Sequence, residues 1–183
     1  MLLILRKTLR GHRLALVSLG LALMGLGVLI PSTFNTFGGG GEDLIHQMPR
    51  GVQAFLKTQG DLLPILGPEG YVAIGYRHPI YIVVIAAFTI AAVSTLAREI
   101  EKGTVFLLLA RPLPRYHLVL AKGAGLLVGL VALLGAALAG TALGVTITDL
   151  GQPVRLSRFL LISYNALLLF LAIGGYGFLL SAL

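Results

Sequence analysis

Long apolar stretches alternate with short polar ones along the chain, and four of the apolar stretches are long enough to cross a membrane. These predicted spans are residues 14–31, 80–97, 118–146 and 159–183. A helix needs about 20 mainly apolar residues to cross roughly 30 Å of hydrocarbon. Because backbone polar groups have to be satisfied inside lipid, and the stretches lack the alternation of a membrane barrel, we expect helices. The pattern therefore predicts an all-α integral membrane protein, a single transmembrane domain over residues 1–183 with four transmembrane helices visible.

The N-terminal segment, residues 1–13, is predicted to be a short interfacial helix. It places Leu2, Leu5 and Leu9 on one face and arginines on another, which is typical of a helix lying at the cytoplasmic membrane surface. A cleaved signal peptide is the alternative interpretation. We disfavour it because no A-x-A cleavage site follows the apolar run.

The segments between the spans differ in length. Residues 32–79 form a long extracytoplasmic loop in which Pro49 opens a short amphipathic helix. A loop of this length is either a lid of packed helices or a binding element. Residues 98–117 form a cytoplasmic loop, and residues 147–158 form a second extracytoplasmic loop.

Composition supports the membrane class. Hydrophobic residues make up 57% of the chain and charged residues only 11%, against about 25% charged residues in an average soluble domain. The net charge of +7 would suggest nucleic acid as a partner of a soluble protein. Here the basic residues flank the apolar stretches, so they are better explained by membrane orientation, and no nucleic-acid partner is expected.

Lysine and arginine are unevenly distributed between the two predicted sides. Nine of the 14 fall in the N-terminal segment, between the second and third spans, or at the start of the third span, and five fall in the outer loops. The side richer in basic residues is expected to be cytoplasmic. This makes the protein multi-pass with a cytoplasmic N-terminus. Lys122 lies at the start of the third span, where we expect its long side chain to snorkel toward the interface.

Motifs for catalysis or cofactor binding are missing from the sequence. No phosphate-binding loop is present, so the chain is not expected to hydrolyse ATP itself. Its four histidines lack metal-ligand spacing, and it has no cysteine. We therefore predict no catalytic, cofactor-binding or metal site. The span centres also hold no charged residue of the kind that ion-coupled carriers use, so the driving force for uphill transport would enter from outside the bilayer.

Small and polar residues are the remaining signals inside the spans. The third span carries two small-xxx-small motifs, which allow close helix packing either within the chain or between two copies. Their glycines are Gly125, Gly129, Gly140 and Gly144. In the fourth span, Tyr164 and Asn165 either line a path or form hydrogen bonds between helices.

The cytoplasmic loop is predicted to form a short helix across the membrane surface. Gly103 allows a sharp reversal because glycine tolerates a positive φ, and Thr104 is a good N-cap. An apolar run of about two turns follows, and Pro112 stops it. Such an apolar run needs a cover, which is either lipid or a groove on a soluble partner.

The stretch LAREIEKGTVFLLLARPLPRYHLVLAK resembles the cytoplasmic loop of ABC-2 type transporter permeases. The resemblance consists of an E-x-G-T step, a leucine-rich helix and an R-P-x-x-R step. It is carried here by Glu101, Gly103, Thr104, Leu107, Leu108, Arg111, Pro112 and Arg115. The preceding PEGYVAIGYRHPIYIVVI, with its His78-Pro79 step, is similar to the start of the second span in the same family. The likeness runs from the basic N-terminus to the last span and is sharpest between Pro68 and Lys122.

The resemblance implies a function that composition does not. Such permeases pair as two transmembrane halves, here expected to be a homodimer, with two ATP-binding cassette subunits that bind ATP and magnesium. The loop helix is then the coupling helix, which passes ATP-driven movement to the spans. The chain would be the permease subunit of an exporter in a prokaryotic inner membrane, surrounded by membrane lipid. Its substrate is not predicted. A non-transporting scaffold or regulator, or a passive facilitator, is the alternative.

By the same resemblance, the cytoplasmic loop supplies the interface with the ATPase partner. The expected interface residues are Glu99, Glu101, Gly103, Thr104, Val105, Leu108, Leu109, Arg111, Pro112 and Arg115. Family members usually have six spans, whereas this chain shows four and ends at Leu183. We therefore expect a fragment that covers the first four spans.

Overall fold

The computed structural model describes residues 10–38, 49, 51, 67–103, 116–151 and 153–182. Every element in these ranges is helical and none is a strand, in agreement with the predicted all-α class. In chain order the elements are α2 (Arg13–Ser32), the π-helix η1 (Phe34–Gly38), α6 (Pro68–Gly75), α7 (Pro79–Glu101), α9 (Tyr116–Ile147) and α10 (Leu156–Ala182). The first nine residues of the predicted interfacial helix and the helix expected after Pro49 lie outside the described residues.

Four helical segments in the described part are long and apolar enough to cross a membrane, which confirms the predicted number of candidate spans. They are Arg13–Thr36, Pro68–Glu101, Val119–Ile147 and Leu156–Ser181. The third and fourth agree with the predicted boundaries to within a few residues. The second begins well before the predicted residue 80, because α6 precedes α7 and belongs to the same apolar segment.

The second candidate span is interrupted between α6 and α7. Pro79 has no N–H and disfavours helical conformation in the residue before it, so α7 starts as a new helix. His78 caps that helix, since its Nδ1 accepts a hydrogen bond from the Ile80 N–H at 3.3 Å. We expected α6 to be part of the outer loop. Instead Val72 on α6 lies in the hydrophobic core, which joins this segment to the bundle.

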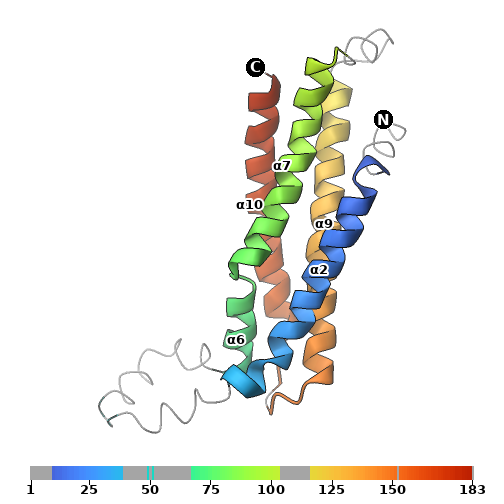
Figure 1. Ribbon diagram of the computed structural model, residues 1–183. Coiled ribbons are helices and arrows are strands. Elements are labelled where there is room, and N and C mark those ends of the chain that lie inside the picture. The colour runs from blue at the N-terminus through green and yellow to red at the C-terminus, as the bar shows by residue number, and fades with distance from the viewer. Residues whose placement is uncertain are drawn as a thin grey trace.

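The long helices run side by side (Figure 1), and an ion pair lies at each of the two ends of the bundle. One end, where α7 stops and α9 starts, holds His12, Glu99 and Lys122, and we call it the Lys122 end. The other, where α6 lies and α10 starts, holds Glu69 and Arg158, and we call it the Glu69 end. The start of α2 and the end of α10 also lie at the Lys122 end.

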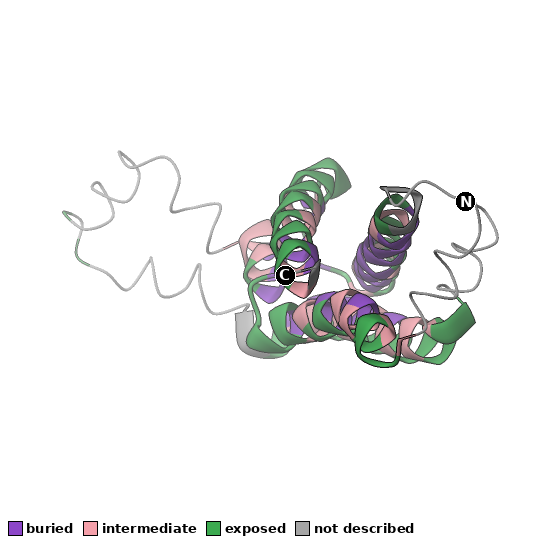
Figure 2. Cartoon of the chain, turned by 90° about the horizontal axis from the view of Figure 1, so that it is seen from above, coloured by how far each residue is buried: buried purple, intermediate pink, exposed green. Residues whose placement is uncertain are grey.

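Helix α9 supplies much of the buried core. Its residues Ala121, Leu126, Leu130, Leu133 and Ala137 are at most 1% exposed. Figure 2 looks along the bundle and shows buried positions on the surfaces that face neighbouring helices and exposed positions on the outside. The outer surfaces carry many large apolar side chains. Apolar outer surfaces of this kind suit a protein surrounded by lipid.

Helices α2 and α9 approach each other closely because both present glycine at the contact. A Cβ added at Gly27 would lie 2.7 Å from the Ala137 carbonyl oxygen. A Cβ at Gly144 would lie 2.9 Å from the Val28 carbonyl oxygen, and one at Gly140 would collide with the backbone of Met24. The motif of Gly140 and Gly144 therefore packs within this chain, against α2.

Candidate functional site

The predicted interface residues fall into two groups in the structure. Glu99, Glu101 and Gly103 lie in or just after the last turn of α7 and are described. The other predicted interface residues lie outside the described residues: Thr104, Val105, Leu108, Leu109, Arg111, Pro112 and Arg115. The described part of the interface therefore consists of the ends of α7 and α9 that flank residues 104–115.

Helix α7 ends in a tight turn. The Lys102 N–H donates to the Arg98 carbonyl at 3.1 Å, and the Gly103 N–H donates to the Ile100 carbonyl at 3.0 Å. Gly103 has a φ of 66°, the left-handed conformation expected from the sequence. A glycine at this position commonly closes a helix because it has no Cβ to clash. The chain therefore turns away from the axis of α7 directly before residue 104.

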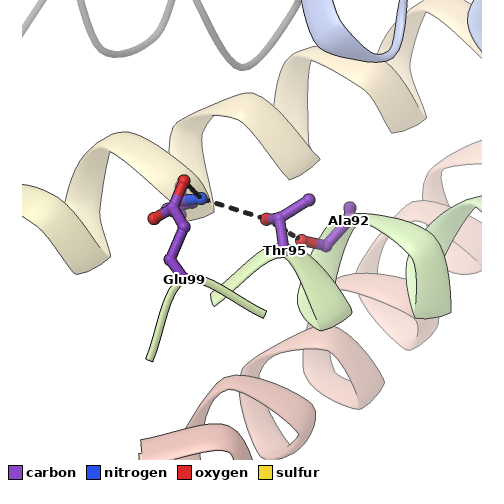
Figure 3. A network of polar contacts seen from close by, with 4 residues as sticks. Ala92, Thr95 and Glu99 are labelled. Atoms are coloured by element: carbon purple, nitrogen blue, oxygen red, sulfur yellow. Dashed lines mark hydrogen bonds and ion pairs between the residues drawn. The ribbon is translucent and has the colours of Figure 1, made fainter. Parts of the chain in front are cut away.

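Lys122 does not snorkel, so the expectation for this residue is wrong. Its side chain is only 3% exposed, and its Nζ forms an ion pair with Glu99 Oε1 at 2.8 Å. It also donates a hydrogen bond to Thr95 Oγ1 at 3.2 Å. Figure 3 shows Glu99 and Thr95 side by side on α7, with the Thr95 hydroxyl directed to the Ala92 carbonyl. The carboxylate of Glu99 keeps the Lys122 ammonium inside the bundle. Without such a partner, the ammonium would have to extend out of the bundle to reach water.

Only part of this ion pair could be predicted from the sequence. Lys122 is a lone charge inside a long apolar stretch, and Glu99 lies near the end of the preceding stretch. Sequence position alone could not show that these two charges meet, because it gives no rotation of one helix relative to the other. Thr95, the third member of the cluster, carried no signal that separated it from other hydroxyls in the spans.

The start of α2 reaches the same cluster. Burial lowers the pKa of His12 below its usual 6.5, and the positive charges of Lys122 and Arg98 lower it further. The imidazole also lies edge-on to the Phe88 ring, with 6.1 Å between ring centroids. Three helices, α2, α7 and α9, therefore meet at the Lys122 end, where the positive charges of Lys122 and Arg98 disfavour protonation of His12.

A second polar cluster closes the Glu69 end. Glu69 Oε2 forms an ion pair with Arg158 Nη1 at 2.7 Å, and Glu69 Oε1 accepts from the Arg155 N–H at 2.7 Å. The Asn35 side-chain amide donates to the Asp149 carbonyl at 3.1 Å. These contacts tie α6 to the start of α10, and η1 to the loop after α9.

Hydroxyl groups form a third cluster, inside the bundle. The hydroxyls of Tyr76 and Thr141 lie 2.9 Å apart, and the Tyr76 ring stacks on Phe159 with 5.6 Å between centroids. The hydroxyls of Tyr81 and Ser163 are buried close to the Tyr76 hydroxyl, and neither forms a hydrogen bond of good geometry in the described part of the chain. The cluster carries no charged group. It supplies packing and hydrogen bonds inside the bundle.

The remaining predicted positions lie on helix surfaces. Tyr164 and Asn165 are exposed on α10 and face away from the bundle. Any path that they line would therefore run outside these four helices. Gly125 is buried, and a Cβ added at Gly129 would collide with the Phe88 ring. Within the described residues, no group of three or more His, Cys, Asp or Glu is placed to hold a metal ion.

Comparison with known proteins gives one match. A family model described as "ABC-2 family transporter protein" matches residues 5–183 of the chain. No curated protein and no solved structure matches it.

Proposed function

Because the chain belongs to the ABC-2 family of transporter proteins, we propose that it is the permease subunit of an ATP-driven exporter. As a member, it is a transporter membrane component, and ABC-2 permeases generally pair with ATP-binding subunits. The proposal adds the direction of transport, the pairing of two copies of this chain, and the part of the chain that receives the ATPase. It places the Lys122 end in the cytoplasm of a prokaryotic cell, where ATP is available.

The loop between α7 and α9 carries the proposal. Nine of the 14 lysines and arginines lie in the N-terminal segment and around this loop, which favours a cytoplasmic location. The turn at Gly103 directs the chain out of α7 just where the apolar run begins. An apolar run flanked by charges suits a groove on a soluble protein, with ion pairs that orient the docking.

Transmission of force follows from this arrangement. ATP-driven closure of the ATPase pair would displace residues 104–115, and the displacement would reach the membrane through α7 and α9. No charged side chain lies at the centre of the described spans that could couple an ion gradient to transport. The energy for transport would then come from ATP in the partner, which also holds the magnesium.

A second copy of the chain would complete the translocation path. Asn165 is exposed in the middle of a candidate span, where an amide facing lipid is costly. Tyr164, the residue before it, is also exposed on α10. We place both residues at the surface on which two copies, or further helices of the same protein, enclose the path.

Affinity purification from native membranes in mild detergent tests the proposal. A stoichiometric ATP-binding subunit with ATPase activity is the expected result. Leu108→Asp should remove this subunit, because a carboxylate in the apolar contact loses its hydration without gaining a partner. Leu14→Asp is the matched control, since it adds the same carboxylate at an exposed apolar residue at the same end of the bundle but outside the loop.

The outcomes separate the candidate functions. Loss of the subunit in the Leu108 variant alone supports the coupling loop. A wild-type preparation without any ATP-binding subunit contradicts the proposal and leaves a scaffold, a regulator or a passive facilitator. Equal retention of the subunit in both variants places the ATPase contact elsewhere on the chain.

A further inference from the structure

The ion pair of Lys122 joins the two helix ends that flank the loop, which are the end of α7 and the start of α9. Helix α7 ends at Glu101 and α9 begins at Tyr116, so residues 102–115 connect them. Glu99 lies in the last turn of α7, and Lys122 lies in the second turn of α9. The 2.8 Å contact between them therefore bridges the helices directly next to the loop, on the membrane side of it.

Lys122 is held at two points, which fixes more than a single contact would. Thr95 and Glu99 are four residues apart on α7, so they lie on the same face about one turn from each other. The ammonium reaches both, at 3.2 Å and 2.8 Å. Sliding α9 along α7 by one residue would break at least one of these contacts. The pair therefore sets both the axial position and the rotation of α9 against α7.

Stability alone does not account for a buried lysine here. Ala121 and Leu126 near it in sequence, and Leu96 next to its partner Thr95, are all buried apolar residues. Removing two charges from water is costly, and a well-packed apolar pair of similar volume is often at least as stable. What an ion pair adds over an apolar contact is a defined geometry. The ion pair is therefore better explained by a positional role of Lys122.

We propose that Lys122 is a positioning residue that makes α7 and α9 move as one unit when the loop is displaced. The coupling part of this inference rests on the proposed function, whereas the rigid joint between the helices does not. Without this joint, a displacement of the loop would separate the end of α7 from the start of α9 instead of moving the spans. With the joint, the displacement passes along both helices toward the Glu69 end.

Distances between spin labels test the joint. The chain has no native cysteine, so two introduced cysteines are labelled without background. Ile100 on α7 and Val119 on α9 are exposed beside the ion pair and outside its contacts. In the full complex, we expect a narrow distance distribution for Ile100→Cys with Val119→Cys that does not change on adding ATP and vanadate. Lys122→Met should broaden or shift it.

A second variant restores the ion pair with the charges of residues 99 and 122 exchanged. The double change Lys122→Glu with Glu99→Lys should recover a narrow distribution, since the opposite charges again face each other. Arg158→Met is the matched control, because it breaks the ion pair at the other end of the bundle. It should leave the distribution at the Lys122 end unchanged. If Lys122→Met does not fold, the reversed pair decides: a narrow distribution supports the joint, and a broad one overturns it.

A second label pair reads the transmitted movement. Ile74 on α6 and Ile147 on α9 are exposed toward the Glu69 end. ATP and vanadate should shift their distance in the wild type, and Lys122→Met should lose the shift while ATP is still hydrolysed. An unchanged distribution at both pairs in Lys122→Met overturns the inference even if the ATPase copurifies. Absence of the ATPase from the wild type would contradict the proposed function without affecting the resting label distance.

Discussion

Substitution of Gly27 by alanine should destabilise the protein, although alanine is the better helix former. The added Cβ would lie 2.7 Å from the Ala137 carbonyl oxygen and 2.8 Å from the Thr141 nitrogen. Both are backbone atoms of α9, which cannot rotate away as a side-chain end would. Such overpacking typically costs about 1–3 kcal/mol. Helix α2 would have to move away from α9, and neighbouring contacts along the pair would loosen.

The matched control lies two residues earlier. Gly25 is on the same helix, but a Cβ there meets nothing within 4 Å. Alanine gains roughly 1 kcal/mol of helix propensity at either position, so this gain cancels in a comparison of the two variants. The difference between Gly27→Ala and Gly25→Ala therefore isolates the steric cost, about 1–3 kcal/mol.

Titration with a denaturing detergent, followed by far-UV circular dichroism, measures both free energies of unfolding. Gly25→Ala should be as stable as the wild type or slightly more so, and Gly27→Ala should unfold at lower denaturant. Equal stability of the two variants would refute the reasoning, because it would mean that α2 and α9 are not in backbone contact at Gly27.

Three further predictions use the same titration. Burial lowers the pKa of His12 below its usual 6.5, so the unfolded chain takes up a proton at a higher pH than the folded protein does. Stability should therefore fall as the pH drops through about 6.5, and His12→Gln should lose this dependence. Tyr76→Phe removes the contact with Thr141 and should lower the free energy of unfolding by about 1 kcal/mol. Tyr81→Phe should cost less, because the Tyr81 hydroxyl forms no hydrogen bond of good geometry in the described structure; an equal loss in both variants would contradict this. Arg158→Met breaks an ion pair whose arginine is 56% exposed, so the free energy of unfolding should fall by less than about 1 kcal/mol. A larger fall would show that this ion pair contributes more to stability than an exposed pair does.

The sequence determined the class of fold and the family. The backbone N–H and C=O groups of a long apolar stretch can be hydrogen-bonded in lipid if the stretch is a helix. The number and approximate limits of the four helices therefore followed from composition and length. The positive φ at Gly103 followed from local chemistry, since glycine between a helix end and a new segment favours a left-handed turn. The resemblance in the loop rested on residues close together in sequence, and the family match extends over residues 5–183. Each of these features can be read along the chain without knowing which helices pack together.

The tertiary structure decided which side chains meet. Whether Lys122 snorkels or is buried depends on the rotation of α9 against α7, and no local pattern contains that rotation. The same holds for Gly140, whose packing partner could equally have been a second copy until α2 was found against it. Helix α6 joined the bundle because Val72 finds partners in the core, a contact between segments far apart in sequence. Contacts of this kind depend on the packing of whole helices, so they appear only once the helices are placed in space.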